Sequence, residues 1–382
     1  MPKNEYSGPR RTRGPARRTS ESVADLSRLN RELPIGSRDK RRVLRTIIAM
    51  NNDRHAKREK KVSYKTMQER EGELWLFFNA LWDTERFATV DPRTLKPKHV
   101  VEVLQTWRAA GLSAKTLLNR LSSLRTYAFW IGKTGLIETA QNEGLDLSEL
   151  KATEVATEDK SWLAHSVDIK AKITEAEEYC PYVAASLHLA SEFALRLKEA
   201  TMVLPHEGVI PIEDVTQPAD RPVGTRYVLR IRGAKGNRPR EIPIVTDNQW
   251  AAIRHAQAVV SPGYPMGRPN RSLKANLQWA YRIFAKIGIT KKQLGVTAHG
   301  VRHQRLNEEF QCVAGVPSPV RGGGPISCEL STLARRSVVR LAGHSRLQIA
   351  SAYCGKPRVS PSASPRQSER KSPTGASLPE DP

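Results

Sequence analysis

The chain has 382 residues, and its 62 lysines and arginines outnumber its 39 aspartates and glutamates to give a formal net charge of +23. It contains no run of about 18 apolar residues, no apolar segment behind its basic N-terminus and no CxxC pair among its four cysteines, which argues against a membrane span, a secretory signal, a zinc site and a disulfide framework. We therefore expect a cytoplasmic, nucleoid-associated protein of two or three domains, whose positive charge points first to nucleic acid and second to an anionic membrane or an acidic protein.

Composition divides the chain into folded and unfolded parts. Residues 1–61 carry 18 basic and 7 acidic residues and begin rich in proline, glycine and arginine, which predicts a basic, partly disordered N-terminal extension with at most a basic helix over 39–61. Residues 138–159 carry 7 acidic residues and 1 basic residue and are predicted to be a linker. The proline- and serine-rich residues 356–382 are predicted to be a disordered tail. Two folded units remain, 62–137 and 160–355.

The smaller unit, 62–137, is predicted to be a helical bundle. Apolar residues recur at steps of three and four, which is typical of helices that bury one face. Gly111 is predicted to end one of these helices, and Ser113 to cap the next. The apolar positions are Leu74, Trp75, Phe77, Phe78, Leu81, Trp82, Val100, Val103, Leu104, Trp107, Leu117, Leu121, Leu124, Ala128 and Ile131.

The larger unit, 160–355, mixes helices with a small amount of strand. A single helix is predicted to run through LHLASEFALRLKEATMVL, and Pro205 to end it. TRYVLRIRG and REIPIV alternate apolar and polar residues around the turn GAKGNRP, which predicts a hairpin. Helices resume at 272–288, with Leu273, Leu277, Tyr281, Phe284 and Ile287 on one side. The fold class is therefore mostly α with a small β-hairpin or sheet (α+β).

Four segments of the larger unit carry reactive residues in a definite order. ALRLKEA contains Arg196 and Glu199, and the hairpin turn GAKGNRP contains Lys235. TAHGVRH places His299 and Arg302 one helical turn apart. LAGHSRLQIASAYCG contains His344 and, nine residues later, Tyr353.

This series resembles the tyrosine recombinase (phage integrase) family. The resemblance covers about 190–355 as the catalytic domain, and 62–137 looks like the SAM-like core-binding domain of that family. It implies a site-specific DNA recombinase that breaks and rejoins DNA through a 3′-phosphotyrosyl intermediate, without metal, ATP or another cofactor. The residue types suit this chemistry, because arginine forks match phosphate oxygens and preorganised cations stabilise a developing oxyanion.

The resemblance also implies a role for each residue. Arg196 and Arg302 would clamp the scissile phosphate, and Tyr353 would attack it. His299 is the candidate base, and Lys235 would protonate the leaving 5′-oxygen.

Two further roles support the reaction and three concern DNA binding. His344 would hydrogen-bond the phosphate, and Glu199 would orient Arg196 or His299. Arg232, Arg238 and Arg240, near the hairpin turn, are expected to contact the DNA backbone.

Three features depart from the family pattern. Phe-Ala-Leu stands before Arg196 where Thr-Gly-Leu is usual. Residues 311–329 form a Gly/Pro-rich insertion, for which a lid, a partner contact and a disordered loop all stay open. The Pro/Ser tail contains no obvious helix, so the exchange of a C-terminal element between subunits also stays open.

The expected partners are double-stranded DNA at specific recombination sites, three further copies of the chain in a homotetramer, and an accessory DNA-bending protein. No membrane partner is expected. The expected role is the integration or excision of a mobile element. Two other functions stay open: a non-catalytic DNA-binding regulator on the same fold, and a type IB topoisomerase.

Overall fold

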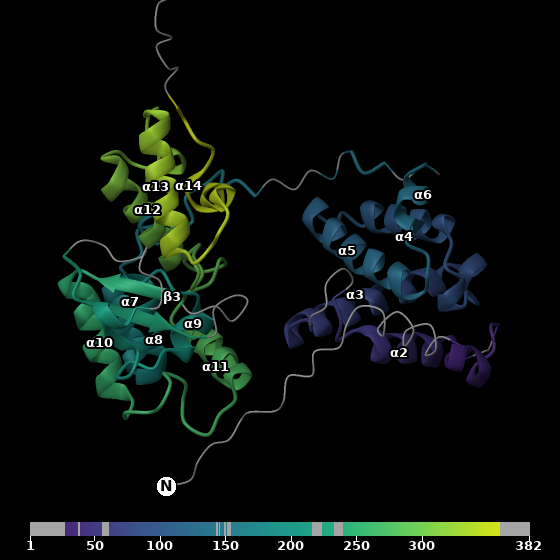
Figure 1. Cartoon of the computed structure of the whole chain (residues 1–382), viewed down its shortest axis with the longest axis horizontal. Coiled ribbons are helices and arrows are strands. Elements are labelled where there is room, and N and C mark those ends of the chain that lie inside the picture. Colours follow the sequence, from purple (N-terminus) through teal and green to yellow (C-terminus); the bar gives the residue numbers. More distant parts are fainter. Residues whose placement is uncertain are drawn as a thin grey trace, which may run out of the picture. The chain divides into compact units, whose positions relative to one another are not determined.

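The computed structural model describes residues 27–36, 39–55, 61–142, 144, 146–148, 150, 154–215, 224–232 and 240–359. The chain divides into two compact units, 1–153 and 154–382, drawn from purple to blue and from teal to yellow in Figure 1. Among the described residues, no helix has both the length and the apolar character needed to cross a bilayer.

The regular elements described in unit 1 are helices, apart from an isolated antiparallel bridge between Arg54 and Lys61. Ser113 caps a helix as expected, since it accepts from the N–H of Thr116, and Ser63 also acts as a cap and accepts from the N–H of Thr66. The expected apolar stripes meet in one core, in which Phe78 and Leu81 are fully buried. The helices are α2 (Lys40–Asn51), α3 (Tyr64–Asp83), α4 (Pro97–Ala109), α5 (Ala114–Trp130) and α6 (Leu136–Asn142), and residues 27–32 are also helical.

Unit 1 is longer at both ends than the predicted unit 62–137. Helix α2 lies in the region expected to be an extension, yet Val43, Leu44 and Ile47 are fully buried in the core of the unit. These residues recur at helical spacing within a very basic segment, so the charge of the segment masked its apolar face. At the other end, α6 begins in the bundle and continues into the stretch expected to be a linker.

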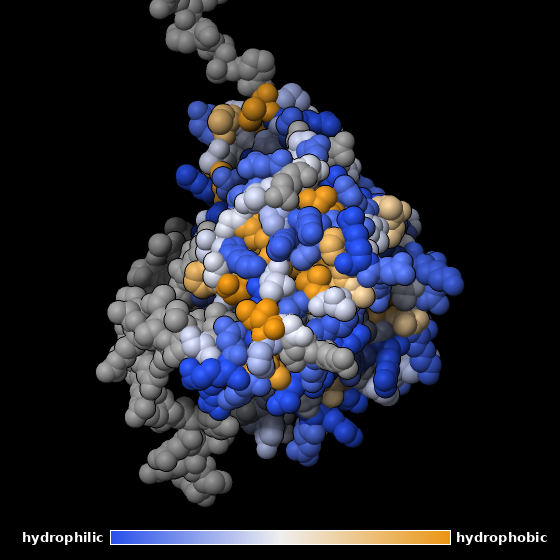
Figure 2. Space-filling view, turned by 90° about the vertical axis from the view of Figure 1, so that its right-hand side faces the viewer, coloured by the Kyte–Doolittle hydropathy of each residue, from blue (hydrophilic) through white to orange (hydrophobic). Residues whose placement is uncertain are grey.

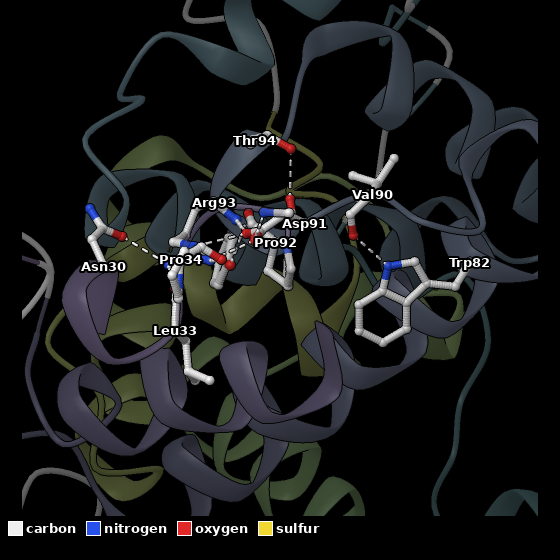
Figure 3. A network of polar contacts seen from close by, with 11 residues as sticks. Asn30, Leu33, Pro34, Trp82, Val90, Asp91, Pro92, Arg93 and Thr94 are labelled. Atoms are coloured by element: carbon white, nitrogen blue, oxygen red, sulfur yellow. Dashed lines mark hydrogen bonds and ion pairs between the residues drawn. The ribbon is translucent and has the colours of Figure 1, made fainter. Parts of the chain in front are cut away.

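A buried arginine fastens the N-terminal segment of unit 1 to its core. Arg93 Nη1 donates to Asn30 Oδ1 at 2.9 Å and to the Leu33 carbonyl at 2.6 Å, and Nη2 donates to the Pro34 carbonyl at 3.2 Å. Nε and Nη2 also reach the two carboxylate oxygens of Asp91, at 2.9 and 2.6 Å (Figure 3). Every nitrogen of this guanidinium therefore has an acceptor, as a buried structural arginine requires.

Unit 2 surrounds a small sheet with helices. Its elements are α7 (Ile169–Glu177), α8 (Pro181–Glu192), α9 (Leu197–Met202), β1 (Val209–Pro211), β2 (Tyr227–Ile231), β3 (Arg240–Ile244), α10 (Asp247–Val259), α11 (Leu273–Lys286), α12 (Gly300–Ala314), α13 (Cys328–Leu341) and α14 (Ser351–Cys354). In Figure 1, α12, α13 and α14 gather together, and α7, α8 and α10 lie beside the sheet.

The sheet has one strand more than the expected hairpin. Strand β2 pairs antiparallel with β3, with Leu229 opposite Ile242, and β1 adds to its other edge with Val209 opposite Leu229. Strand β1 is only three residues long, which is too short for a periodic signal. The fold class, mostly helical with a small sheet, is confirmed.

Helix α11 forms as expected, and of its predicted apolar side only Tyr281 is exposed, while Leu273 and Leu277 are half-buried. Ile283, Phe284 and Ile287 are buried, whereas Tyr281, which we placed on the buried side, is 59% exposed. Near its C-terminal end the helix has apolar side chains at both 281 and 283, and packing buries Ile283 instead of Tyr281.

Part of the 311–329 insertion is packed against α12. Ser318 is fully buried and its hydroxyl donates to Asn307 Oδ1 on α12 at 2.5 Å. Arg321 Nε lies 3.0 Å from Asp159 Oδ2, and Ile326 forms a parallel bridge with Val359. These contacts argue against the disordered-loop alternative for this segment. The tail from residue 360 onward lies outside the described residues.

Apolar side chains are also scattered over the surface. Figure 2 draws one face, on which blue hydrophilic residues surround several orange apolar patches. Leu76 and Phe129 in unit 1 are about half exposed, at 50% and 48%. Singly exposed apolar side chains of this kind are ordinary on protein surfaces.

Candidate active site

A sharp break between α8 and α9 presents Arg196. We expected one continuous helix here, and this expectation is wrong, because α8 ends at Glu192 and α9 begins at Leu197. Between them Ala194 has φ 50, in the left-handed region that interrupts a right-handed helix. Arg196 follows with an extended backbone as the N-cap of α9. It therefore stands at the start of a helix and not on the side of one.

Glu199 is a buried carboxylate shared by the surrounding arginines. Its side chain is only 2% exposed, and Oε1 lies 2.5 Å from Arg196 Nη1. Its Oε2 accepts from the backbone N–H of Arg196 at 2.9 Å and from Arg240 Nη2 at 3.2 Å, and lies 3.8 Å from Arg302 Nη1. Glu199 thus fixes Arg196, as expected, and also holds Arg240 beside it.

Arg302 is fully buried and joins three parts of the site. Its Nη1 donates to the carbonyl of Ala194 at the α8–α9 break, and Nη2 donates to the carbonyl of Ala342 at 2.6 Å. Its Nε makes a long hydrogen bond of 3.4 Å to the hydroxyl of Tyr353. Burial lowers the pKa of Arg302, while attraction to Tyr353 opposes this effect. One guanidinium therefore ties the break, the turn after α13 and the tyrosine together.

Tyr353 lies on α14 with three histidine rings around it. It is 7% exposed, and its ring centroid is 4.9 Å from that of His303, 6.4 Å from His299 and 6.5 Å from His344. Its backbone carbonyl accepts from Asn307 Nδ2 at 3.2 Å. Because Asn307 also binds Ser318, the packed insertion helps to hold the short helix that carries Tyr353.

Two of the three histidines around Tyr353 are held in the neutral form. Desolvation by the surrounding chain and repulsion by Arg302 lower the pKa of His299 to about 4, although the residue is partly exposed to solvent. Burial and the neighbouring His299 lower the pKa of His303 to about 3. Arg196 Nη2 lies 3.0 Å from His344 Nε2, and since a guanidinium only donates, this nitrogen of His344 is the acceptor. At neutral pH His299 and His303 are therefore uncharged.

At the start of α12, where His299 is the N-cap, the backbone of Gly300 lies close to the ring of Trp162. A Cβ at Gly300 would lie 2.6 Å from Trp162 Cδ1 and 2.7 Å from the carbonyl of Lys160. The indole N–H of Trp162 in turn donates to the carbonyl of Thr297 at 2.8 Å. Glycine at 300 lets this segment pack directly against the turn that presents His299.

The charges of this cluster do not balance. Arg196, Arg240 and Arg302 provide three guanidinium charges against the single carboxylate of Glu199, which leaves two positive charges. An excess of buried or half-buried positive charge favours an anion as the missing component.

The structure brings together Arg196, Glu199, His299, Arg302, His344 and Tyr353, all of which the sequence singled out. Lys235 and Arg238 lie outside the described residues. Arg232 is exposed after β2, as a DNA contact would be, but Arg240 is 8% exposed and lies inside the site. The prediction that Arg240 is a surface residue is therefore wrong.

Sequence reasoning also gave His303 no part in the site, although it lies one helical turn after His299 and could have been included on that spacing alone. For Arg240 the signal was the alternation in REIPI, where positions 240, 242 and 244 share the buried face of the strand. Among the described residues, no group of three or more His, Cys, Asp or Glu side chains is arranged to hold a metal ion.

Comparisons with known proteins concern the N-terminal domain and the overall fold. Residues 48–137 match the family model of the phage integrase N-terminal domain. The structure of a lambda integrase dimer bound to a COC′ core site is similar with a TM-score of 0.51 at 14% identity, covering 86% of this chain and 79% of that one.

Two further solved structures are similar at 13% identity and a TM-score of 0.47, each covering 82% of this chain. One is a lambda integrase tetramer bound to a Holliday junction, of which 76% is covered. The other is the Tn1549 transposon integrase with a circular intermediate DNA, of which 95% is covered. No curated protein matches the chain.

Proposed function

We propose that the chain is a tyrosine recombinase, a site-specific DNA recombinase that breaks and rejoins strands through Tyr353; the match of residues 48–137 to the phage integrase N-terminal domain and the similar fold support this. One observation carries the proposal. Arg302 donates to the hydroxyl of Tyr353 inside a cluster that holds three arginines and only one carboxylate. A phenol nucleophile next to an uncompensated positive charge suits attack on a phosphodiester.

The proposed step conserves the phosphodiester. The hydroxyl oxygen of Tyr353 attacks the phosphorus, the bond from phosphorus to the 5′-oxygen breaks, and a 3′-phosphotyrosyl ester and a 5′-hydroxyl result. The phenol loses one proton and the 5′-oxygen gains one, so no net proton is needed. Attack by a 5′-hydroxyl on the phosphotyrosine reverses the step and rejoins the strand.

Each neighbouring residue has a task in this step. Neutral His299 receives the proton of the phenol, and Lys235 donates a proton to the 5′-oxygen. Arg196 and Arg302 bind the non-bridging oxygens, where charge grows in the transition state. His344 Nε2 accepts from Arg196 in the free protein, so it donates to the phosphate only after DNA takes over Arg196 and Nε2 gains a proton.

We also propose double-stranded DNA as the partner and four protomers as the active assembly. The described surface of unit 2 offers a basic contact in which Arg268, Arg271 and Arg282 surround Trp279 on and before α11, with Arg268 stacked 4.7 Å from the indole ring. Arginines of this kind bind backbone phosphates, together with Arg232 and Arg238. The biological role would be movement of a mobile element, with an accessory DNA-bending protein assisting.

A trapping experiment tests the reaction. Short duplexes tiled across the DNA that flanks the gene, each with a nick beside the candidate cleavage position, are incubated with the protein in a chelating buffer without ATP. The nick lets the small 5′ fragment diffuse away, so the covalent complex accumulates. We expect an adduct that survives denaturation and maps to Tyr353 by mass spectrometry.

Two variants decide the assignment. Tyr353→Phe should abolish the adduct, and Tyr179→Phe, at a tyrosine of the same unit that is 43% exposed, should leave it unchanged. An adduct in Tyr353→Phe refutes the assignment of the nucleophile. Relaxation of supercoiled plasmids without the site, by protomers alone, would favour a topoisomerase over a recombinase.

A further inference from the structure

Arg240 occupies a core-facing position of strand β3. It alternates with Ile242 and Ile244, which are 3% and 5% exposed, and is itself 8% exposed. The next residue, Glu241, pairs instead with Arg230 of β2 at 2.7 Å. A charged residue on the buried face of a strand costs several kcal/mol unless its donors are satisfied, so its presence needs an explanation.

The donors of Arg240 are not satisfied by the described protein. Nη2 reaches Glu199, but Nε and Nη1 are buried and have no hydrogen-bond partner in this part of the chain. The contrast with Arg93 in unit 1 is direct, because that arginine is equally buried and all of its nitrogens have acceptors. Arg240 therefore lacks the contacts of a structural arginine.

The contact that Arg240 does make has a consequence for Arg302. Arg240 Nη2 is 3.2 Å from Glu199 Oε2, and Arg302 Nη1 is 3.8 Å from the same oxygen. Without Arg240, the carboxylate would attract Arg302 into a closer pair and neutralise part of its charge. Arg240 thus keeps Glu199 from competing for the guanidinium that touches Tyr353.

The turn after α13 covers Arg240 and separates it from solvent. Gly343 has φ 68, and a Cβ there would lie 2.7 Å from Arg240 Cδ and 2.8 Å from Nη1. Gly343 is exposed on its other side, and the next residue is His344. Only a residue without a side chain lets Arg240 lie directly beneath the turn that carries His344.

We propose that Arg240 is a positioning residue of the reaction centre, which occupies Glu199 so that Arg302 and Arg196 remain available to the phosphate, and which adds its own charge beside Tyr353. This inference rests on the proposed function. Burial lowers the pKa of Arg240 to about 10, with Glu199 opposing the shift, so the guanidinium stays protonated at neutral pH. Its attraction to the ionised form of Tyr353 acts in the same direction as that of Arg302.

The test compares Arg240→Met, Arg240→Lys and the control Arg230→Met in the full chain. Methionine keeps much of the buried volume but removes the charge, and the cluster still holds two arginines against one carboxylate. We therefore expect the melting temperature of Arg240→Met to equal or exceed that of the wild type, while the single-turnover rate of adduct formation falls about 100-fold. Arg240→Lys keeps the charge, so its rate of adduct formation should be at least about tenfold higher than that of Arg240→Met. Arg230→Met should react like the wild type.

A second substrate isolates the effect of charge. A duplex whose scissile phosphate is a methylphosphonate lacks the negative charge that the arginines bind. If Arg240 acts through its charge, the loss caused by Arg240→Met should shrink from about 100-fold to less than about tenfold on this substrate. A purely structural role predicts the same loss on both.

The outcomes separate the two proposals. Absence of an adduct with wild-type protein on every duplex refutes the proposed function and, with it, this inference. A wild-type adduct together with full activity of Arg240→Met, an equal loss on both substrates, or a large fall in the melting temperature overturns the role of Arg240 alone.

Discussion

Glu199→Gln is the sharpest single test of how the site is held together. The substitution keeps the shape of the side chain and removes one charge. In the wild type this carboxylate receives the backbone N–H of Arg196 and the side chains of Arg196 and Arg240, and it lies 3.8 Å from Arg302. The amide of glutamine would turn donors toward groups that are themselves donors.

The expected cost is large because the group is buried. Glu199 is 2% exposed, so solvent screens these contacts little. Breaking a buried ion pair by removing one partner costs about 3–5 kcal/mol, since it leaves the other charge uncompensated. Here three guanidiniums would be left without a counter-ion, so we expect a loss in this range for the free energy of unfolding of unit 2.

The same residue predicts a dependence of stability on pH. Burial alone would raise the pKa of Glu199, but the charges of Arg240 and Arg196 and the N–H of Arg196 outweigh it and hold the pKa below its ordinary value of 4.5. A carboxyl whose pKa is lowered by folding stabilises the protein above its unfolded value. The difference between wild type and Glu199→Gln should therefore be full above about pH 4.5 and shrink as the pH falls through the lower, folded pKa.

The measurement has to read unit 2 alone, because a chain of two units need not unfold in one step. Protein equilibrated in urea at each pH is labelled by a short deuterium pulse at one fixed pH, and peptides covering α9 and α12 are read by mass spectrometry. Glu175→Gln is the control, since its carboxylate is 40% exposed beside Lys172 and should contribute at most about 1 kcal/mol. A loss below about 1 kcal/mol for Glu199→Gln, or a loss that persists unchanged to low pH, would refute the role of this carboxylate.

Three other changes probe the rest of the molecule. Gly300→Ala should drive a methyl group into Trp162 and displace His299, lowering the melting temperature and slowing adduct formation, whereas Gly324→Ala, in open space, should do neither. Lys235→Ala should slow cleavage of an ordinary duplex but not of a duplex with sulfur at the 5′-bridging position, because a thiolate leaves without a proton. Equal slowing of both duplexes would exclude Lys235 as the acid. Deleting residues 1–26, with six lysines and arginines, should reduce the slope of log affinity against log salt by up to about five, and an unchanged slope would mean that this segment makes no contact with phosphates.

The last of these experiments differs from the one that the sequence suggests. On composition alone, all of residues 1–61 would be deleted as a basic extension. The structure places Val43 and Ile47 of α2 in the core of unit 1, fully buried, so that deletion would unfold the unit and not only remove charge. Residues 1–26 precede the first described residues and are the appropriate target.

Local physics made much of the fold predictable. The cap at Ser113 and the apolar stripes of α3, α4 and α5 follow from hydrogen bonding and periodicity within one element. The nine-residue spacing from His344 to Tyr353 could be predicted in the same way, because both residues lie in one continuous stretch of chain. Features that depend on contacts between elements could not be read, as the exposed Tyr281 and the third strand show.

Arg240 illustrates why the site was harder to predict than the fold. The alternation in the strand predicts a buried side chain at 240, whereas the positive charge of arginine favours an exposed one. A buried arginine becomes intelligible only when its counter-ion is known, and Glu199 lies 41 residues earlier in the chain. The sequence contains no short-range signal for that pairing.

The alanine at 194 shows how such a site can keep a strained backbone. An L-residue at φ 50 lies in a conformation that costs roughly 1–2 kcal/mol, and no glycine or proline marks the place in the sequence. The conformation persists because the surroundings oppose its relaxation: the carbonyl of Ala194 accepts from Arg302, and its methyl group is fully buried against α12 and α13. Straightening the chain into one helix would withdraw that carbonyl from a buried guanidinium and move Arg196 away from Glu199. The presence of alanine at 194, where glycine is usual, therefore affects more than packing. The strained residue accepts a hydrogen bond from Arg302 and so helps to hold Arg302 against Tyr353.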